Sequence, residues 1–169
     1  MAGGSRVWPP VVGSWSSHFA DFDAFLAELV LDRVARIDGQ AAALRDSAGT
    51  GTVAGNLTGA LTDLFESVAV AIVSLVTSRD DLRARLRQTT PAGIPVLTEA
   101  TAMIASYLTA ERELGRITAD ADIATLAPML IGTGHLLFAD RKSAPPDAGA
   151  VLKAVTAATA GVTPTTEPA

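Results

Sequence analysis

The sequence predicts an all-α fold, with about six helices packed in one domain. Apolar residues recur at intervals of three and four along most of the chain, which places them on one face of a helix. The chain has 169 residues, enough for one domain to bury a full core. The longest apolar run, residues 68–76, is β-like in composition, but helical periodicity on both sides of it favours helix.

The composition excludes several functional classes. A formal net charge of −5 points away from a protein that binds phosphate backbones, because such proteins are usually basic. The lack of cysteine excludes disulfides and cysteine-ligated zinc, and the two distant histidines exclude a His-rich metal site. No carboxylate, base or nucleophile stands at a catalytic spacing, so we expect neither an enzyme nor a cofactor.

The N-terminus and the apolar runs predict a cytoplasmic protein without a membrane segment. Residues 1–10 contain one arginine and no apolar core segment, unlike a secretory signal. The run 68–76 is less than half of the ~20 residues that a membrane-spanning helix needs.

The first predicted helix begins at Asp21, a suitable N-cap, and runs to about Asp46. Residues 1–17 are rich in Gly, Pro, Ser and Trp and have no helical period. A Gly-rich connection, residues 47–56, follows the helix; it lacks the glycine spacing and the lysine of a phosphate-binding loop. The apolar stripe of this helix consists of Leu26, Val30, Val34, Ile37, Ala41 and Leu44.

The next helix is predicted over residues 57–76. It is apolar nearly all round, so we expect it in the centre of the domain. Ser78 is a candidate N-cap for a short helix that ends near Leu86. Pro95 stands in the first turn of a further helix, which Gly115 ends.

Two helices are predicted in the last third of the chain. Asp120 or Asp122 caps the first of them, which runs to Phe138. Pro128 lies inside this pattern and is expected to kink the helix or to reset its start. The last helix is predicted over residues 147–162, and a disordered tail, residues 163–169, follows it.

Residues 13–37, GSWSSHFADFDAFLAELVLDRVARI, resemble a passage of the TetR family of bacterial transcriptional regulators. In that family the passage leads from the end of the recognition helix into the first helix of the regulatory domain. Residues 107–138 are similar to a second passage, in which a helix ends in glycine and an acidic-capped helix with small residues follows. With the helix count and order, the resemblance covers roughly residues 13–162. The positions of the first passage that fall on the family's frame are Gly13, Ser14, Trp15, His18, Phe19, Asp21, Asp23 and Leu26.

The DNA-reading part of the family is mostly missing. The family's head has three helices, whereas only residues 1–12 precede the matched end of the recognition helix. Ser16 and Phe22 replace a tyrosine and a lysine that usually contact phosphate in the family. The resemblance therefore implies an irregular segment, 1–19, with a remnant of the recognition helix, followed by a regulatory domain, 20–162.

Ser14 and His18 are the candidate DNA-binding residues of this remnant. His18 is alternatively an exposed residue of a frayed terminus, because the helix that it needs is missing. We therefore expect that this chain alone does not bind an operator.

The resemblance implies a pocket for a small apolar ligand between the helices. Methionine and aromatic side chains suit an adaptable apolar cavity, although plain core is the commoner role of any single one. Tyr107 is the strongest candidate, because a buried phenol needs a hydrogen-bond partner. The candidates, on the inward faces of the helices, are Phe65, Ile72, Met103, Tyr107 and Met129.

The resemblance also implies that the last two helices, about 120–140 and 147–162, pair with their copies in a four-helix dimer interface. Gly132 and Gly134 each cost about 1 kcal/mol of helix stability relative to alanine, which is tolerated where helices approach closely. Packing within the domain is the alternative. His135 is interpreted as a ligand contact, a pH-sensitive group at the seam, or a satisfied interior or interface histidine. The expected interface residues are Leu130, Gly134, His135, Phe138, Val151 and Val155.

These features predict a TetR-like ligand-sensing and dimerising domain that takes part in transcriptional regulation. Its expected partners are a second copy of the chain, a full-length relative in a heterodimer, and a small apolar ligand. Two alternatives stay open: a helical homodimeric interaction module, and the truncated product of a gene for a complete DNA-binding, ligand-responsive repressor.

Overall fold

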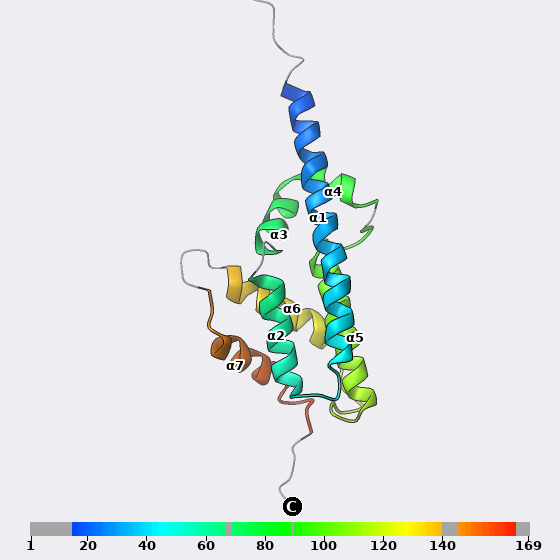
Figure 1. The fold of residues 1–169 in the computed structure, drawn as a ribbon, viewed down its shortest axis with the longest axis vertical. Helices are drawn as coiled ribbons and strands as arrows, with labels where there is room; N and C mark the ends of the chain where they lie inside the picture. Colours follow the sequence, from blue (N-terminus) through cyan, green and yellow to red (C-terminus); the bar gives the residue numbers. More distant parts are fainter. Residues whose placement is uncertain (1–14, 67–68, 89, 140–144, 165–169) are drawn as a thin grey trace, which may run out of the picture.

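The described part of the chain consists of helices joined by turns and loops. The computed structural model describes residues 15–66, 69–88, 90–139 and 145–164, with side chains from residue 22 onward. Within these ranges it has seven helices and no strand, which confirms the all-α prediction. In chain order (Figure 1) they are α1 (Trp15–Asp46), α2 (Val53–Phe65), α3 (Ala69–Ser78), α4 (Asp80–Leu86), α5 (Leu97–Glu113), α6 (Ile123–Ala139) and α7 (Ala148–Thr159).

α1 is the longest helix and starts earlier than the sequence predicts. It begins at Trp15, so the predicted start at Asp21 is wrong, and residues 15–19 of the segment expected to be irregular are helical. Its 32 residues span about 48 Å. The first turns of α1 project beyond the other helices (Figure 1), and Phe22 and Phe25 remain 46% and 59% exposed.

The prediction of one helix over residues 57–76 is wrong, because the segment forms two helices, α2 and α3, bent by 57°. At the end of α2, Arg33 of α1 donates from Nη2 to the carbonyl oxygen of Leu64 at 3.0 Å. This contact joins residues 31 apart in the sequence, and the helical period carries no sign of it. Each helix buries one apolar face and leaves other positions exposed, such as Gly59 of α2 and Ala71 of α3, so the expected burial on all sides is wrong.

Some helix ends follow their predicted signals. Gly115 has φ of +71° just after α5, and the Asp122 carboxylate accepts the Thr125 N–H at 3.1 Å at the start of α6. Both predictions are confirmed. Ser78 is wrong as an N-cap, because it is the last residue of α3 and α4 starts after Arg79.

The two prolines act differently from their predicted roles. Pro95 precedes α5, which begins at Leu97. Between them, Val96 has φ of +76°, a strained value for a β-branched residue, and its N–H donates to Glu99 Oε2 at 2.7 Å. α6 continues through Pro128 without a new start.

The C-terminal helix ends slightly before its predicted boundary. α7 stops at Thr159, and the N–H and hydroxyl of Thr163 both donate to the Thr159 carbonyl oxygen, at 3.1 Å each. Residues 165–169 of the predicted tail lie outside the described residues.

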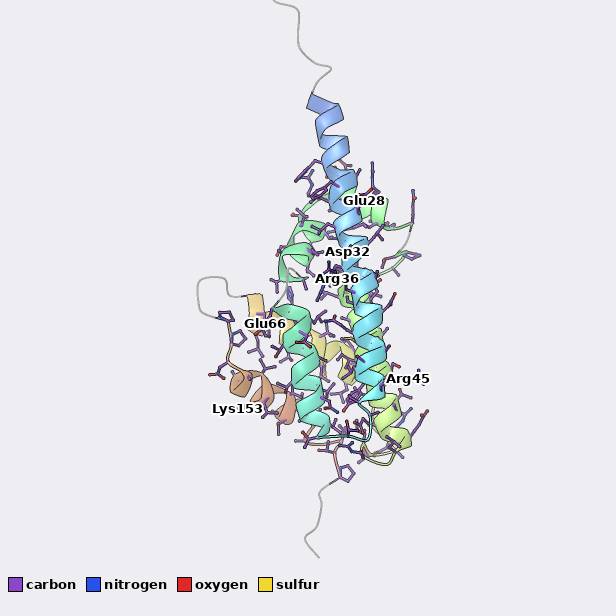
Figure 2. All side chains as sticks on the ribbon, in the orientation of Figure 1. Glu28, Asp32, Arg36, Arg45, Glu66 and Lys153 are labelled. Carbon is purple, nitrogen blue, oxygen red and sulfur yellow. The ribbon has the colours of Figure 1, made fainter. Side chains whose placement is uncertain are left out.

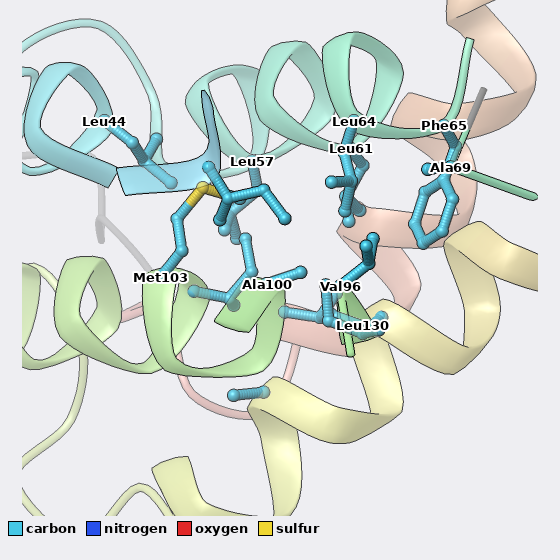
Figure 3. Close-up of a cluster of buried hydrophobic side chains, with 14 of the residues drawn as sticks. Leu44, Leu57, Leu61, Leu64, Phe65, Ala69, Val96, Ala100, Met103 and Leu130 are labelled. Atoms are coloured by element: carbon cyan, nitrogen blue, oxygen red, sulfur yellow. The ribbon is translucent and has the colours of Figure 1, made fainter. Parts of the chain in front are cut away.

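The core lies between α1, α2, α5 and α6. α1 packs along α5, α5 packs on α6, and α2 packs on α7, whereas α1 and α2 touch at few positions. Figure 3 shows Met103 of α5 facing Leu44 of α1 and Leu57 of α2. α1 is therefore anchored mainly on α5, whereas α2 is anchored mainly on α7 and α6.

Candidate functional site

Four of the five predicted ligand-pocket residues lie in the packed core. Phe65, Ile72, Met103 and Tyr107 are between 0% and 3% exposed and belong to one hydrophobic cluster. Met129 is 55% exposed, so the prediction that it faces inward is wrong. α6 presents Leu126, Leu130, Ile131 and Gly134 to the core, and Met129 lies on its other side.

Tyr107 has the hydrogen-bond partner that a buried phenol needs, and that partner belongs to the chain itself. Its hydroxyl donates to Glu111 Oε1 at 2.5 Å and accepts a hydrogen bond from Asn56 Nδ2 at 3.0 Å. Burial, together with the hydrogen bond to Glu111, raises the pKa of Tyr107 well above its ordinary value of 10.0. The phenol therefore stays neutral, with its bonds satisfied inside the fold.

Glu111 is a fully buried carboxylate that the sequence analysis did not single out. Besides Tyr107, its Oε2 lies 3.4 Å from Arg116 Nη1 and accepts the Gly49 N–H at 3.4 Å. Arg116 in turn donates from Nη2 to the carbonyl oxygen of Gly51 at 2.7 Å. Asn56, Tyr107, Glu111 and Arg116, called the polar cluster below, thus hold the turn between α1 and α2. Tyr107 and Glu111 are four residues apart on α5, a spacing visible in the sequence.

A second buried charge, Arg33, is balanced by backbone rather than by a carboxylate. Arg33 is 7% exposed and has no ion pair among the described residues. Its Nη2 donates to the Leu64 carbonyl oxygen at 3.0 Å and lies 3.5 Å from that of Asp63. Burial lowers the pKa of Arg33, and the negative end of the α2 dipole offsets the cost of its charge. We assign Arg33 a structural role at the end of α2.

The six residues expected in a dimer interface pack largely within their own chain. Leu130, Val151 and Val155 are at most 1% exposed, so their side chains are buried within their own chain. Gly134 is also buried, because a Cβ there would lie 2.7 Å from the Phe65 ring of α2.

His135 and Phe138 are partly exposed and contact the same ring of Phe65. Their ring centroids each lie 6.0 Å from that of Phe65, His135 edge-on and Phe138 stacked. The Nδ1 atom of His135 is buried and has no hydrogen-bond partner among the described residues.

Most solvent-facing residues of α6 are apolar. This helix has no Asp, Glu, Lys or Arg, and Leu136 on its exposed side is 75% exposed. Gly132 also faces solvent, and a Cβ built on it meets nothing within 4 Å. On α7, Leu152 is 42% exposed, and Lys153 is the single charged residue of that helix (Figure 2). The solvent-facing residues, called the outer face of α6, are Ala124, Thr125, Pro128, Met129, Gly132, Leu136 and Ala139.

The side chains of the two residues in the predicted DNA-binding remnant lie outside the described part of the structure. Ser14 lies outside the described residues, and His18 lies in α1 with its side chain outside the described part. At the same end of the molecule, Arg79 forms an ion pair with Asp23 at 2.7 Å and lies 5.5 Å from the centroid of the Phe22 ring. Among the residues that the structure describes, no group of three or more His, Cys, Asp or Glu side chains is arranged to hold a metal ion.

Comparisons with models of known protein families, with curated proteins and with solved structures each found no match. The resemblance to the TetR family therefore stays a prediction from the sequence. No single described helix is long and apolar enough to cross a membrane; α2 and α3 reach that length and composition only as a pair, with the 57° bend between them.

Proposed function

We propose that this chain is a self-associating regulatory domain similar to those of the TetR family, and that two copies pair through α6 and α7. The observation that carries the proposal is the outer face of α6, where Leu136 and Met129 are 75% and 55% exposed on a helix without charged residues. Monomeric soluble proteins rarely expose large apolar patches.

Hydrophobic burial supplies a driving force for this pairing. Met129, Gly132 and Leu136 are spaced by three and four residues, so they form one row along α6. Burying a side chain such as Met or Leu completely contributes about 1.5–3 kcal/mol. In the proposed dimer, α6 of each copy would bury its Met129 and Leu136 side chains against the other copy.

Gly132 at the middle of this row supports close contact between helices. Gly134, two residues later, is needed inside the chain to admit the Phe65 ring. No such need exists at Gly132, because nothing in the chain lies within 4 Å of a Cβ there. A glycine costs helix stability, so its presence on the exposed side favours an interface in which backbones approach closely.

The regulatory part of the proposal is supported by the resemblance of residues 13–37 and 107–138 and by the all-helical architecture in the described ranges. Phe65, Met103 and Tyr107 are buried in the hydrophobic core, and the Tyr107 hydroxyl is already bonded to Glu111. The support for self-association is therefore stronger than the support for an apolar ligand at those positions.

Disulfide trapping tests which face pairs, because the chain has no cysteine of its own. A residue near a two-fold axis lies close to its own copy, so Leu136→Cys is expected to form a covalent dimer under mild oxidation. The matched control is Leu114→Cys, which is 57% exposed at the end of α5. Equal, low yields of covalent dimer from both variants would contradict pairing through α6.

A further inference from the structure

The projecting end of α1 carries a row of large apolar side chains that the rest of the described chain leaves exposed. Phe22, Phe25 and Leu29 are 46%, 59% and 38% exposed. They are spaced by three and four residues, so they form one row along the helix. α1 packs mainly on α5 and α4, and it takes no part in the proposed pairing of α6 and α7. These three residues are called the α1 strip below.

The Phe22 end of the α1 strip is held against the start of α4. Arg79, the residue before α4, pairs with Asp23 at 2.7 Å, and its guanidinium lies 5.5 Å from the centroid of the Phe22 ring. A cation near the face of an aromatic ring is attracted by it. Asp23 is only 8% exposed, so this ion pair belongs to the packing of α1 on α4. The strip therefore has a fixed position on the fold.

An unpaired carboxylate lies beside the other end of the strip. Glu28 is exposed, directly precedes Leu29 and is three residues from Phe25 on the same helix (Figure 2). It forms no ion pair among the described residues, whereas Asp32, one turn later, is already paired with Arg36 at 3.0 Å. An apolar segment that ends in a cation would therefore complement both the strip and this carboxylate.

Residues 6–12, RVWPPVV, have this combination and stand shortly before α1 in the sequence. They lie outside the described residues. Arg6 is the one Lys, Arg, Asp or Glu among residues 1–20, and the six residues after it are Val, Trp and Pro. Consecutive prolines favour a polyproline-type backbone, and such segments bind to surfaces lined by aromatic rings. Gly13 follows them and supplies the backbone freedom that a reversal of the chain needs.

The segment is long enough to return along α1. An α-helix rises about 1.5 Å per residue, which places Phe25 about 15 Å and Glu28 about 20 Å from Trp15, the first residue of α1. An extended chain covers about 3.3 Å per residue, so Trp8 reaches up to about 23 Å and Arg6 up to about 30 Å from Trp15. Each partner is therefore within reach. A short tether also keeps the effective concentration of the segment high, so a few contacts suffice.

We propose that residues 6–12 fold back along α1 of the same chain and cover the α1 strip. In this arrangement Trp8 packs against Phe25, and Arg6 pairs with Glu28. Their own chain is the favoured occupant over a second copy, because the segment is tethered next to the strip and matches it in both apolar character and charge. This contact is independent of self-association through α6. An external partner meets the strip only after the segment has been displaced.

Tryptophan fluorescence of the full-length chain tests the proposal. The chain has two tryptophans, so in the Trp15→Phe variant Trp8 is the single one. We expect its emission at shorter wavelength, and its quenching by acrylamide weaker, than in the same variant unfolded in urea. Adding Phe25→Ser removes the central ring of the strip. This change is expected to lower the ratio of covered to free strip at least about fivefold and to expose Trp8.

Leu114→Ser in the same background is the matched control, because Leu114 is 57% exposed at the end of α5, against 59% for Phe25. It is expected to leave the emission of Trp8 unchanged. Far-ultraviolet circular dichroism of each variant checks that it folds. Glu28→Gln is expected to weaken the protection of Trp8 at low salt and to have less effect at high salt, where the charge contact is screened.

Three results would overturn the proposal: a Trp8 as accessible to acrylamide in the folded chain as in urea, equal effects of Phe25→Ser and Leu114→Ser, or protection that is lost on dilution. The last would assign the strip to a second copy. Leu136→Asp, which removes the proposed pairing through α6, is expected to leave Trp8 protected. Failure of the one proposal therefore leaves the other intact.

Discussion

At the scale of single residues, the interior of this protein is organised around one buried carboxylate. Glu111 has no solvent exposure and gathers Tyr107, Arg116 and the Gly49 N–H around its two oxygens. The sequence predicted that Tyr107 would need a partner but not that the partner would be Glu111. Helical spacing places Tyr107 and Glu111 on the same side of α5. That side is buried because the turn between α1 and α2 packs against it.

Removing this carboxylate is expected to destabilise the fold strongly. Glu111→Ala leaves Arg116 and the Tyr107 hydroxyl without their shared acceptor, and breaking a buried ion pair costs about 3–5 kcal/mol. Glu113→Ala, at an exposed position on the same helix, is expected to change the free energy of unfolding by less than about 0.5 kcal/mol. Urea denaturation followed by circular dichroism compares the two; equal losses would contradict the role assigned to Glu111.

The pH dependence of stability gives a second prediction for the polar cluster. The pKa of Tyr107 is raised in the folded state above its ordinary value of 10.0, so the neutral phenol stabilises the fold fully below about pH 10. This contribution is lost as the pH rises above 10, because the unfolded chain then releases the proton and the folded chain keeps it.

The chain has one tyrosine, so this titration can be followed without interference. Tyrosinate absorbance is expected to stay low in the folded protein above pH 10 and to rise only when the chain unfolds. Urea-unfolded protein, in which the phenol is in water, serves as the control. A folded-state titration that coincides with the control would contradict the buried, hydrogen-bonded phenol.

At the scale of helices, the apolar stripes were predictable and several ends were not. The repeat that includes Leu26, Val30 and Ile37 correctly marked the core side of α1. The break between α2 and α3 follows no proline or glycine signal; Arg33 binds the last carbonyls of α2 there, and the period of the sequence does not record such a tertiary contact. Val96, in a left-handed conformation before α5, is likewise held by its surroundings rather than by its own preference.

The two glycines of α6 give a prediction in which the same substitution, glycine to alanine, destabilises the fold at one position and stabilises it at the other. Gly134→Ala forces a methyl group against the Phe65 ring, only 2.7 Å away, and is expected to destabilise the fold by about 1–3 kcal/mol. Gly132→Ala meets nothing within 4 Å and is expected to stabilise the single chain by about 1 kcal/mol through helix propensity.

Thermal denaturation at low protein concentration, where association contributes least, compares these two variants with the wild type. If Gly132→Ala destabilised the chain as much as Gly134→Ala does, the assignment of inward and outward sides of α6 would be wrong.

At the scale of the whole molecule, the sequence does not show which side of the apolar helix α6 faces its own chain. Residues on every side of α6 are apolar, so the pattern that includes Leu130 and Gly134 looked as suitable for an interface as the one that includes Met129 and Leu136. The fold decides between them, because α2 and α5 cover the first set and leave the second exposed.

The central claim, that two copies pair through the outer face of α6, is tested most directly by the molar mass in solution. Size-exclusion chromatography with light scattering is expected to give the wild type twice the mass of the 17.3 kDa chain, and Leu136→Asp the mass of one chain. Leu114→Asp, at a leucine that is 57% exposed elsewhere on the chain, should remain a dimer. A wild type of 17.3 kDa at every concentration tested, or a Leu136→Asp variant that stays a dimer, would contradict the account.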